Sequence, residues 1–392
     1  MSLLTEVVRQ RGATYLEHHG ASVLPSHVRA IQQISRCRTA ELGGHVGHCV
    51  NCHHEHLLYH SCRHRACPQC GTLQTGRWIE QQRELLLPVP YYHVVFTLPS
   101  ELRRVVRTNQ KILLPILFRA AYESLAELCE DPHFLGAQIG ALAVLHTWTR
   151  TLNWHPHVHL LVPGGGLAAD GETWVPVPRR KTRYLVPTAA LSVKFRGRFM
   201  ALARRALPEG QLPWVPAPKR WVTYAKPVVQ GAPQVIEYLG RYVHKTAMGN
   251  HAVVASDQQA VTFRYTDGRT HERRQMTLPV DEFLRRFLQH VLPRGFHRVR
   301  CYGLLQSHHR GALKRLQLML ATREDVVDVA ARLESPRTQP TRCPSCGEQA
   351  VVRGGRLSTA ECLAFGLAPT IVELALRSRA PPRQEPRRHQ TR

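Results

Sequence analysis

Three histidines occupy every second position of the segment Asn153–Val162. An extended strand points alternate side chains to one face, so a strand here presents the three imidazoles as a row with about 7 Å between neighbours. Pro156 and the β-branched Val158 favour such a strand over a helix. Imidazole is the commonest metal ligand in proteins. The segment therefore predicts a metal site on a partly buried strand that carries His155, His157 and His159, and a solvated basic strand is the alternative.

The charge balance limits the partners of the chain. Lysine and arginine outnumber aspartate and glutamate by 53 to 28 among 392 residues, which gives a formal net charge of +25. This surplus favours a polyanion, nucleic acid before a membrane surface, because no run of about 18 apolar residues is present to span a bilayer. The first residues also lack the layout of an export signal. We expect a cytoplasmic, nucleoid-associated bacterial protein whose eleven cysteines are reduced and serve as metal ligands.

Two Cys-x2-Cys pairs in the first 88 residues predict a zinc-ribbon-like module. Fourteen residues separate the pairs, a spacing at the short edge of the range for four thiolates around one structural Zn²⁺. Cys37 and Cys62 remain over and can replace a ligand, build a second site or be buried thiols. The predicted zinc ligands are Cys49, Cys52, Cys67 and Cys70, with Cys62 as a substitute. A third pair far downstream is half a ribbon and a candidate for a second zinc, through Cys343 and Cys346.

The order of the remaining elements predicts an α+β fold. A β-rich run at 91–98 precedes a long helical pattern to about residue 130, and strand candidates at 140–149 and 155–162 form an antiparallel hairpin. A helix from 234 and a strand at 260–265 complete β-α-β-β-(insertion)-α-β, the split βαβ order of ferredoxin-like folds. The predicted regions are a zinc-binding DNA-recognition module at 1–88, a catalytic domain at 89–268 with an insertion at 164–232, a basic helical region at 269–335, a small zinc-binding segment at 336–379 and a disordered basic tail at 380–392.

Two tyrosines four positions apart lie in the predicted helix that begins at about residue 234. Tyr238 and Tyr242 leave the same helix face one turn apart, and Lys245 follows on that side. A pair of amphipathic core tyrosines is the ordinary explanation of this spacing. A neighbouring metal site and a bound polyanion would instead supply what a tyrosine nucleophile needs, a Lewis acid and a phosphodiester. Lys245 or the cation would then lower the phenol pKa or protonate the leaving 3′ oxygen.

Four motifs in one order resemble a known family. The runs Phe96–Leu98, His157–His159 and Tyr242–Lys245 occur in the order of the three motifs of HUH nucleases, which act in rolling-circle replication. The chain resembles more closely the insertion-sequence ninety-one family of two-tyrosine transposases, including its zinc-binding N-terminal domain. This likeness covers residues 10 to 305 and is carried by Ser61–Cys70, Tyr92–Pro99, His155–Gly166 and Tyr238–Tyr242.

The resemblance implies an HUH nuclease core and a DNA strand-transferase. By it, Tyr242 or Tyr238 attacks single-stranded DNA at an element end and leaves a 5′-phosphotyrosine and a free 3′ hydroxyl. His157 and His159 would hold Mg²⁺ or Mn²⁺. The third ligand stays open between His155, Gln234, Glu237 and His146, which a hairpin turning near Thr151 would place opposite His157. We rank Tyr242 as the first nucleophile because Lys245 stands three residues after it.

Three other functions remain as alternatives. They are a plasmid or phage replication initiator with the same nuclease core, a non-catalytic zinc-dependent DNA-binding protein and a metal-dependent hydrolase of small molecules. Two tyrosines and an appended zinc module favour transposition over initiation. We assign recognition of the element ends to the zinc module and phosphate contacts to the basic segment, with Arg285, Arg286, Arg298 and Arg300 as the candidates.

Overall fold

A computed structural model gives the fold of the chain. The described residues are 3–178, 185–215, 221–228, 233–234, 236–237, 240, 247–249, 251–321 and 342–364. Contacts divide the chain into two compact units, the first from Met1–Ser35 and His64–Arg332 and the second from Arg36–Arg63 and Leu333–Arg392. Among the described helices, none is long and apolar enough to cross a membrane.

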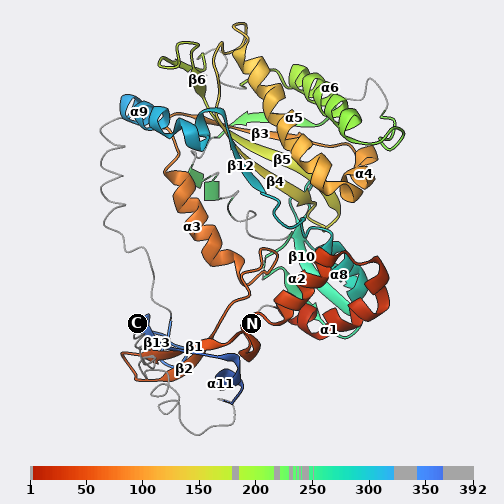
Figure 1. Ribbon diagram of the computed structural model, residues 1–392, viewed down its shortest axis with the longest axis vertical. Coiled ribbons are helices and arrows are strands. Elements are labelled where there is room, and N and C mark those ends of the chain that lie inside the picture. Colours follow the sequence, from red (N-terminus) through yellow and green to blue (C-terminus); the bar gives the residue numbers. More distant parts are fainter. Residues whose placement is uncertain are drawn as a thin grey trace, which may run out of the picture. The chain divides into compact units, whose positions relative to one another are not determined.

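A five-stranded antiparallel sheet is the centre of the first unit (Figure 1). Its strand order is β12-β4-β5-β3-β8, and every neighbouring pair is antiparallel. The predicted hairpin is present, because β4 pairs with β5 around residues 149–153. The strands are β3 (Tyr91–Thr97), β4 (Ala141–Trp148), β5 (Trp154–Pro163), β8 (Thr223–Pro227) and β12 (Val299–Tyr302).

Helices cover one face of this sheet. In Figure 1, α5 (Gln110–Glu130) and α6 (Thr188–Ala206) lie side by side over the strands, and the short α4 (Arg103–Thr108) precedes α5. Fully buried aromatic rings join the layers, for example Phe96 of β3 and Phe195 of α6, whose ring centroids are 4.9 Å apart. The predicted single helix to residue 130 is divided at Asn109, whose backbone leaves the helical region.

The opposite face carries a second apolar cluster and the histidines. Leu142 and Val144 of β4 and Leu161 of β5 belong to this cluster, together with the buried Ile236. The partly buried Trp78 and Ile79 of α3 (Gly71–Arg83) and residues of α9 (Arg310–Leu320) pack against it. Because neighbouring residues of a strand point to opposite faces, the same face holds His146, His157 and His159.

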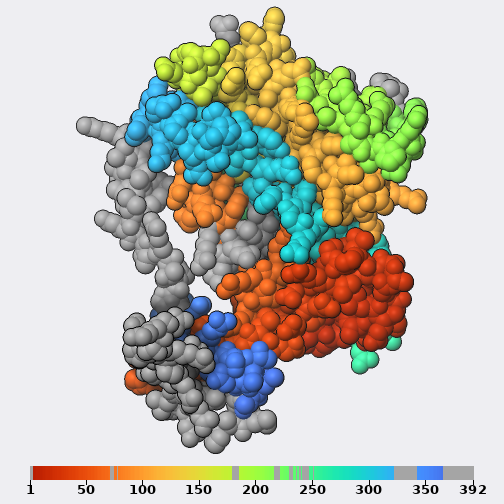
Figure 2. All heavy atoms as spheres, in the orientation of Figure 1, coloured from red at the N-terminus to blue at the C-terminus, as the bar shows by residue number. Residues whose placement is uncertain are grey.

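Helices α1 (Leu3–His19) and α2 (Pro25–Ser35) pack near a separate three-stranded sheet of the first unit. That sheet has the order β11-β10-β9, from β9 (Val253–Ser256), β10 (Ala260–Thr266) and β11 (Arg273–Pro279), and α8 (Val280–Leu288) follows it. Helix α1 contacts both β9 and α8. In Figure 2 the red atoms of α1 and α2 fill one surface lobe, with teal atoms of the β9–α8 segment at its edges.

The second unit contains a small three-stranded sheet with the order β13-β1-β2. Its elements are β1 (Gly44–Cys49), β2 (Glu55–Tyr59), β13 (Val351–Leu357) and the short helix α11 (Thr359–Ala364). Strand β13 pairs antiparallel with β1 although about 300 residues lie between them. In the first unit, β6 (Gly165–Leu167) and β7 (Trp174–Pro176) form a two-stranded ribbon.

Several elements are distributed differently from the predicted regions. The strand at 260–265 forms as β10, but it pairs with its sequence neighbours β9 and β11 and not with the central sheet. The predicted insertion at 164–232 contains the helix α6, and its strand β8 joins the central sheet as an edge strand beside β3. The region 269–335 is not only helical, because it contributes β11 and β12. Helices α1 and α2 belong to the first unit, so 1–88 is not one module. The tail at 380–392 lies outside the described residues.

Candidate metal centre

Three imidazoles converge at one end of the central sheet. His146 lies opposite His157 in the β4–β5 pairing, and His159 follows two residues along β5 on the same face. One ring nitrogen from each of the three lies within 4.8 Å of the others. The third member of the cluster is therefore His146, which antiparallel pairing brings next to His157. It is one of the alternatives that the sequence left open.

Hydrogen bonds orient two of these rings. The Nδ1 of His157 lies 2.7 Å from the carbonyl oxygen of His155, and because a carbonyl only accepts, Nδ1 carries the proton and Nε2 has a lone pair. The Nδ1 of His159 lies 2.8 Å from the Nε2 of His93 on β3. The Nε2 of His159 is buried and has no hydrogen-bond partner within the described part of the chain. A buried polar atom of this kind fits a metal ligand.

Burial keeps the cluster neutral at physiological pH. Desolvation lowers the pKa of His157 to about 4, and it holds the pKa values of His146 and His159 well below the usual range for histidine. Neighbouring imidazoles add to the lowering for His146 and His159. Neutral imidazole is the form that binds a metal ion, so these residues need not lose a proton before they bind one.

His155 lies outside the convergent group. Its Nδ1 lies 2.8 Å from Nη2 of Arg103, and because guanidinium only donates, this ring nitrogen accepts. Burial lowers the pKa of His155 to about 4, and His157 and Arg103 add to the lowering. The convergent group therefore contains His157 and His159 of β5 and His146 of β4, and it does not contain His155 of the predicted row.

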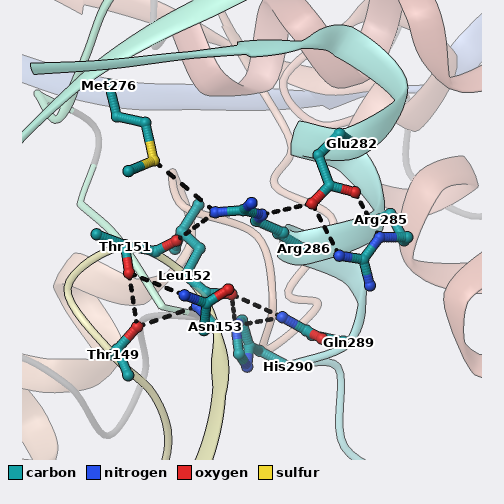
Figure 3. A network of polar contacts seen from close by, with 10 residues as sticks. All are labelled: Thr149, Thr151, Leu152, Asn153, Met276, Glu282, Arg285, Arg286, Gln289 and His290. Carbon is teal, nitrogen blue, oxygen red and sulfur yellow. Dashed lines mark hydrogen bonds and ion pairs between the residues drawn. The ribbon is translucent and has the colours of Figure 1, made fainter.

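A polar network fixes the turn between β4 and β5 (Figure 3). Leu152 adopts a left-handed backbone with φ of 63°. Its carbonyl oxygen accepts from Gln289 at 2.6 Å and lies 3.1 Å from Nε2 of His290, and Arg286 donates to the carbonyl of Thr151 at 3.1 Å. The last turn of α8 and the two residues after it therefore hold the turn that sets the register of His146 against His157.

The predicted nucleophiles Tyr238 and Tyr242 and the predicted proton donor Lys245 lie outside the described residues. Their described neighbours do have contacts. Ile236 is fully buried in the apolar cluster on the face of the sheet that holds the histidines. Glu237 forms an ion pair with Arg83 of α3.

Gly240 also lies against α3. A Cβ added at Gly240 would come within 2.6 Å of Cγ1 of Ile79, so the backbone here approaches the helix more closely than a larger residue permits. The two contacts of this segment, with Arg83 and Ile79, are both with the C-terminal part of α3.

The structure groups two of the predicted zinc ligands with the downstream cysteine pair. Cys49 and Cys52 lie together with Cys343 and Cys346. The sulfur atoms of these four cysteines, all of which belong to the second unit, lie within 4.8 Å of one another. Two Cys-x2-Cys pairs that are close in sequence need not bind the same ion. Each pair supplies two of the four ligands of a tetrahedral zinc site, and any second pair that is close in space can supply the other two.

Two of the four predicted phosphate-binding arginines have contacts inside the protein. Arg298 is only 8% exposed, lies over the Trp148 ring with 5.6 Å between Cζ and the ring centroid, and has its pKa lowered to about 9 by burial. Arg286 is mostly buried between Glu282 and Thr151. These internal contacts make Arg286 and Arg298 weaker candidates for phosphate contacts than Arg285 and Arg300.

The other two arginines keep that assignment as a prediction. Arg285 is 45% exposed at its side chain, although it bonds Glu282 at 2.6 Å. Arg300 lies over the Phe118 ring at 4.7 Å and remains partly exposed. Each can reach solvent at its guanidinium without unfolding a packed element.

Sequence reasoning missed His93 as a member of the site. Its ring stacks on His159 with centroids 5.0 Å apart, and burial lowers its pKa to about 4. A signal existed, because His93 is the one ionisable residue with a normal pKa near neutrality in the apolar strand β3. A buried histidine in a strand next to a histidine row is a candidate partner of that row.

Two family models match the chain. A model described as "Putative transposase" matches residues 140–312, which include β4, β5 and the tyrosine segment. A model described as "Transposase zinc-binding domain" matches residues 7–98. The second match includes all of Cys37, Cys62, Cys67 and Cys70 but ends before the downstream pair.

Two curated relatives are transposases by name. The chain is 40% identical over 326 residues to "Putative transposase y4qJ" of Sinorhizobium fredii (strain NBRC 101917 / NGR234), covering 78% of this chain and 81% of the relative. It is 31% identical over 304 residues to "Transposase for insertion sequence element IS801" of Pseudomonas savastanoi pv. phaseolicola, covering 71% and 70%. No solved structure matches the chain.

A histidine cluster on an antiparallel sheet, cysteines placed as candidate metal ligands and a strongly basic chain fit a metal-dependent protein that acts on DNA. The family matches make the class specific, a transposase with a zinc-binding domain. The chain belongs to the insertion-sequence ninety-one (IS91) family of two-tyrosine transposases, as the sequence motifs predicted. This membership favours transposition over the replication-initiator, regulator and hydrolase alternatives.

Proposed function

We propose that this transposase cuts and rejoins single-stranded DNA at element ends through a 5′-phosphotyrosine, with a divalent cation at the histidine cluster. One observation carries the proposal. Ile236, two residues before Tyr238, is buried on the face of the sheet that holds His146, His157 and His159. The chain two residues before the first tyrosine thus lies on the same face of the sheet as the candidate metal ligands.

The order of elements supports an HUH nuclease core. The run β3–α5–β4–β5–α6–β8 gives a sheet order of β4-β5-β3-β8 with both helices on one face, which is the split βαβ arrangement. Strand β5, which carries His157 and His159, lies next to β3 within this sheet. The fourth strand and second helix come from the region predicted as an insertion, so the tyrosine segment is an addition to this core.

The histidine cluster fits a borderline divalent ion better than Mg²⁺. Within the described residues, the group consists of three neutral imidazoles and contains no carboxylate. Mg²⁺ prefers oxygen ligands, whereas imidazole suits transition metals. We therefore propose Mn²⁺ before Mg²⁺. When bound, the cation would act as a Lewis acid on the scissile phosphate.

The residues of the chain would do the remaining chemistry. The phenol of Tyr242 releases its proton to solvent, and its oxygen forms a bond to phosphorus while the bond from phosphorus to the 3′ oxygen breaks. The tyrosine then carries the 5′ phosphate, and the 3′ oxygen leaves as a hydroxyl after it receives a proton, which Lys245 can donate. The covalent bond stores the phosphodiester energy, so a 3′ hydroxyl can reverse the step and rejoin a strand. Tyr238 would serve a second cleavage.

Recognition of DNA would be divided between two kinds of contact. The charge of +25 supplies salt-dependent affinity for phosphates. We propose that the zinc-binding region selects element ends, and its exposed His53, His54 and Arg63 are candidates for the contact. Deleting residues 1–80 is a poor test, because it also removes α1 and α2 from the first unit. Point substitutions of these three residues test the assignment directly.

The decisive experiment uses single-stranded oligonucleotides from the element ends, the full chain, and Mn²⁺ or Mg²⁺. We expect a covalent adduct that peptide mapping locates at Tyr242, and no adduct with the His157→Ala variant. Tyr265→Phe is the matched control, since Tyr265 lies on β10 away from the cluster. An adduct that forms at an unchanged rate in Tyr242→Phe would overturn the ranking of the tyrosines, and absence of any adduct with either metal would overturn the mechanism.

A further inference from the structure

Four cysteines from the two ends of the chain meet in the second unit. Sγ of Cys49 lies 3.7 Å from Sγ of Cys346, and Sγ of Cys52 lies 3.7 Å from Sγ of Cys343. A disulfide requires about 2.05 Å between sulfur atoms, so neither pair is bonded. Tetrahedral zinc with bonds of about 2.3 Å requires sulfur atoms about 3.8 Å apart, which matches both pairs.

The backbone of each pair has the same local form. The amide of Cys49 donates to the carbonyl of His54 at 3.0 Å, and the amide of Cys343 donates to the carbonyl of Glu348 at 2.8 Å. Both bonds join a cysteine to the residue five positions later. Two segments of unrelated sequence therefore fold into equivalent tight turns around the same four sulfur atoms.

The residue that follows the second cysteine closes each turn. His53 and Gly347 both have a left-handed backbone, with φ of 56° and 79°. Their amides donate to the carbonyls of Cys49 at 2.9 Å and Cys343 at 3.0 Å. Both turns therefore reverse the chain in the same way after the second cysteine.

The apolar core of the second unit is too small to hold this arrangement without a ligand. Its described buried side chains form two clusters, one of Cys49, Cys343 and Val351 and one of Val46, Leu357 and Cys362. Domains with so little buried apolar surface usually depend on metal ions or disulfides. A bound metal ion would supply the missing stabilisation.

We propose that Cys49, Cys52, Cys343 and Cys346 bind a structural Zn²⁺ that joins the C-terminal segment to the N-terminal ribbon. This ion is distinct from any ion that Cys67 and Cys70 bind, because those two cysteines are not members of the group. The site closes a chain separation of 297 residues between Cys49 and Cys346 and holds β13 against β1. The ribbon is therefore complete only after the nuclease region has been synthesised, and a chain truncated before residue 343 lacks it.

Cobalt substitution of the full-length protein tests the site without DNA. Each Co²⁺–thiolate bond contributes charge-transfer absorbance, and the histidine cluster contributes none. We expect the Cys343→Ser/Cys346→Ser protein to lose about half of this absorbance and one thiolate-bound zinc per chain. The Cys67→Ser/Cys70→Ser protein should lose the other half. Cys301→Ser is the control, because Cys301 on β12 belongs to neither pair.

Thiol alkylation of the wild-type protein gives a measurement that does not depend on the folding of a variant. Cys52 and Cys346 are exposed, so N-ethylmaleimide should reach them at once unless a metal ion holds them. We expect both to be protected until a zinc chelator is added. Rapid alkylation of Cys346 in zinc-loaded protein, recovery of Cys343 and Cys346 as a disulfide, or unchanged cobalt absorbance in the Cys343→Ser/Cys346→Ser protein would each overturn the proposal.

Discussion

The Nε2 of His93 lies 2.8 Å from the Nδ1 of His159, and the two rings stack with an interplanar angle of 13°. His159 can bind a metal through Nε2 only in the tautomer that carries its proton on Nδ1. His93 must then accept that proton through its own Nε2. Metal-binding histidines commonly donate their second N–H to such a partner, so His93 is a positioning residue for His159.

Replacing His93 with alanine should weaken Mn²⁺ binding by about 10-fold to 100-fold, because His159 loses the acceptor that fixes its tautomer. His93→Gln should lose less, since an amide oxygen can accept the same proton. Titration followed by the electron paramagnetic resonance of free Mn²⁺ measures both. His133→Ala is the control, because that ring is 90% exposed and distant in sequence from the cluster. Equal affinity of His93→Ala and wild type would refute the role.

The identity of the third ligand gives a second prediction. His146 belongs to the convergent group, whereas His155 bonds Arg103. His146→Ala should abolish measurable Mn²⁺ binding at micromolar concentrations, and His155→Ala should change the affinity by less than about threefold. The same titration distinguishes the two variants. A larger loss in His155→Ala than in His146→Ala would return the original row of three on β5 as the ligand set.

The turn network gives a prediction for stability against pH. Burial lowers the pKa of His290 to about 3, whereas the unfolded chain has the usual value near 6.5. The native state thus excludes a proton that the unfolded state binds, and stability present above pH 6.5 is lost as the pH falls toward 3. His290→Gln stays neutral throughout and keeps an N–H donor for the Leu152 carbonyl.

Relative to His290→Gln, the wild-type protein should lose about 2 kcal/mol in its free energy of unfolding between pH 7 and pH 5. Urea denaturation of both proteins at each pH measures this difference, and the other buried histidines cancel because both proteins contain them. The matched control is His308→Gln, at an exposed position outside the turn network. A constant difference between wild type and His290→Gln across this range would show that His290 is protonated in the native state.

The sequence predicted the histidine pairing better than the cysteine pairing. A hairpin has a short turn, so the position of His146 opposite His157 follows from local register once the turn at residues 149–153 is recognised. Each Cys-x2-Cys turn was likewise predictable. The partner of each turn was not, because the choice depends on whether chain ends about 300 residues apart meet, and no local pattern encodes that.

The same division applies to the strands. The apolar alternation of Ala260–Thr266 predicted a strand, and β10 forms there. Membership of a sheet depends on packing between distant segments, and the fourth strand of the central sheet proved to be β8, a short edge strand whose pattern is weak. His93 was missed for a related reason, since its partner lies on a neighbouring strand and 66 residues away.

Gly240 and Ile79 provide a test of whether α3 positions the nucleophile segment. Gly240 stands between Tyr238 and Tyr242, and a Cβ there would lie 2.6 Å from Cγ1 and 2.8 Å from Cδ1 of Ile79. Both contacts fall below the van der Waals limit, so a substituted segment must shift or push Ile79 aside. Small displacements of a reacting group reduce rates steeply.

Gly240→Ala should therefore slow formation of the covalent DNA adduct by about 10-fold to 100-fold while Mn²⁺ affinity stays unchanged, since the histidines are untouched. The second substitution Ile79→Ala removes the colliding atoms and should restore most of the rate in the double variant, although Ile79→Ala alone loses some packing. Single-turnover cleavage of an end oligonucleotide measures all four proteins of this cycle. If the losses are additive and no rescue occurs, the effect of Gly240→Ala is local to the segment that contains Gly240. In that case α3 does not position the tyrosines.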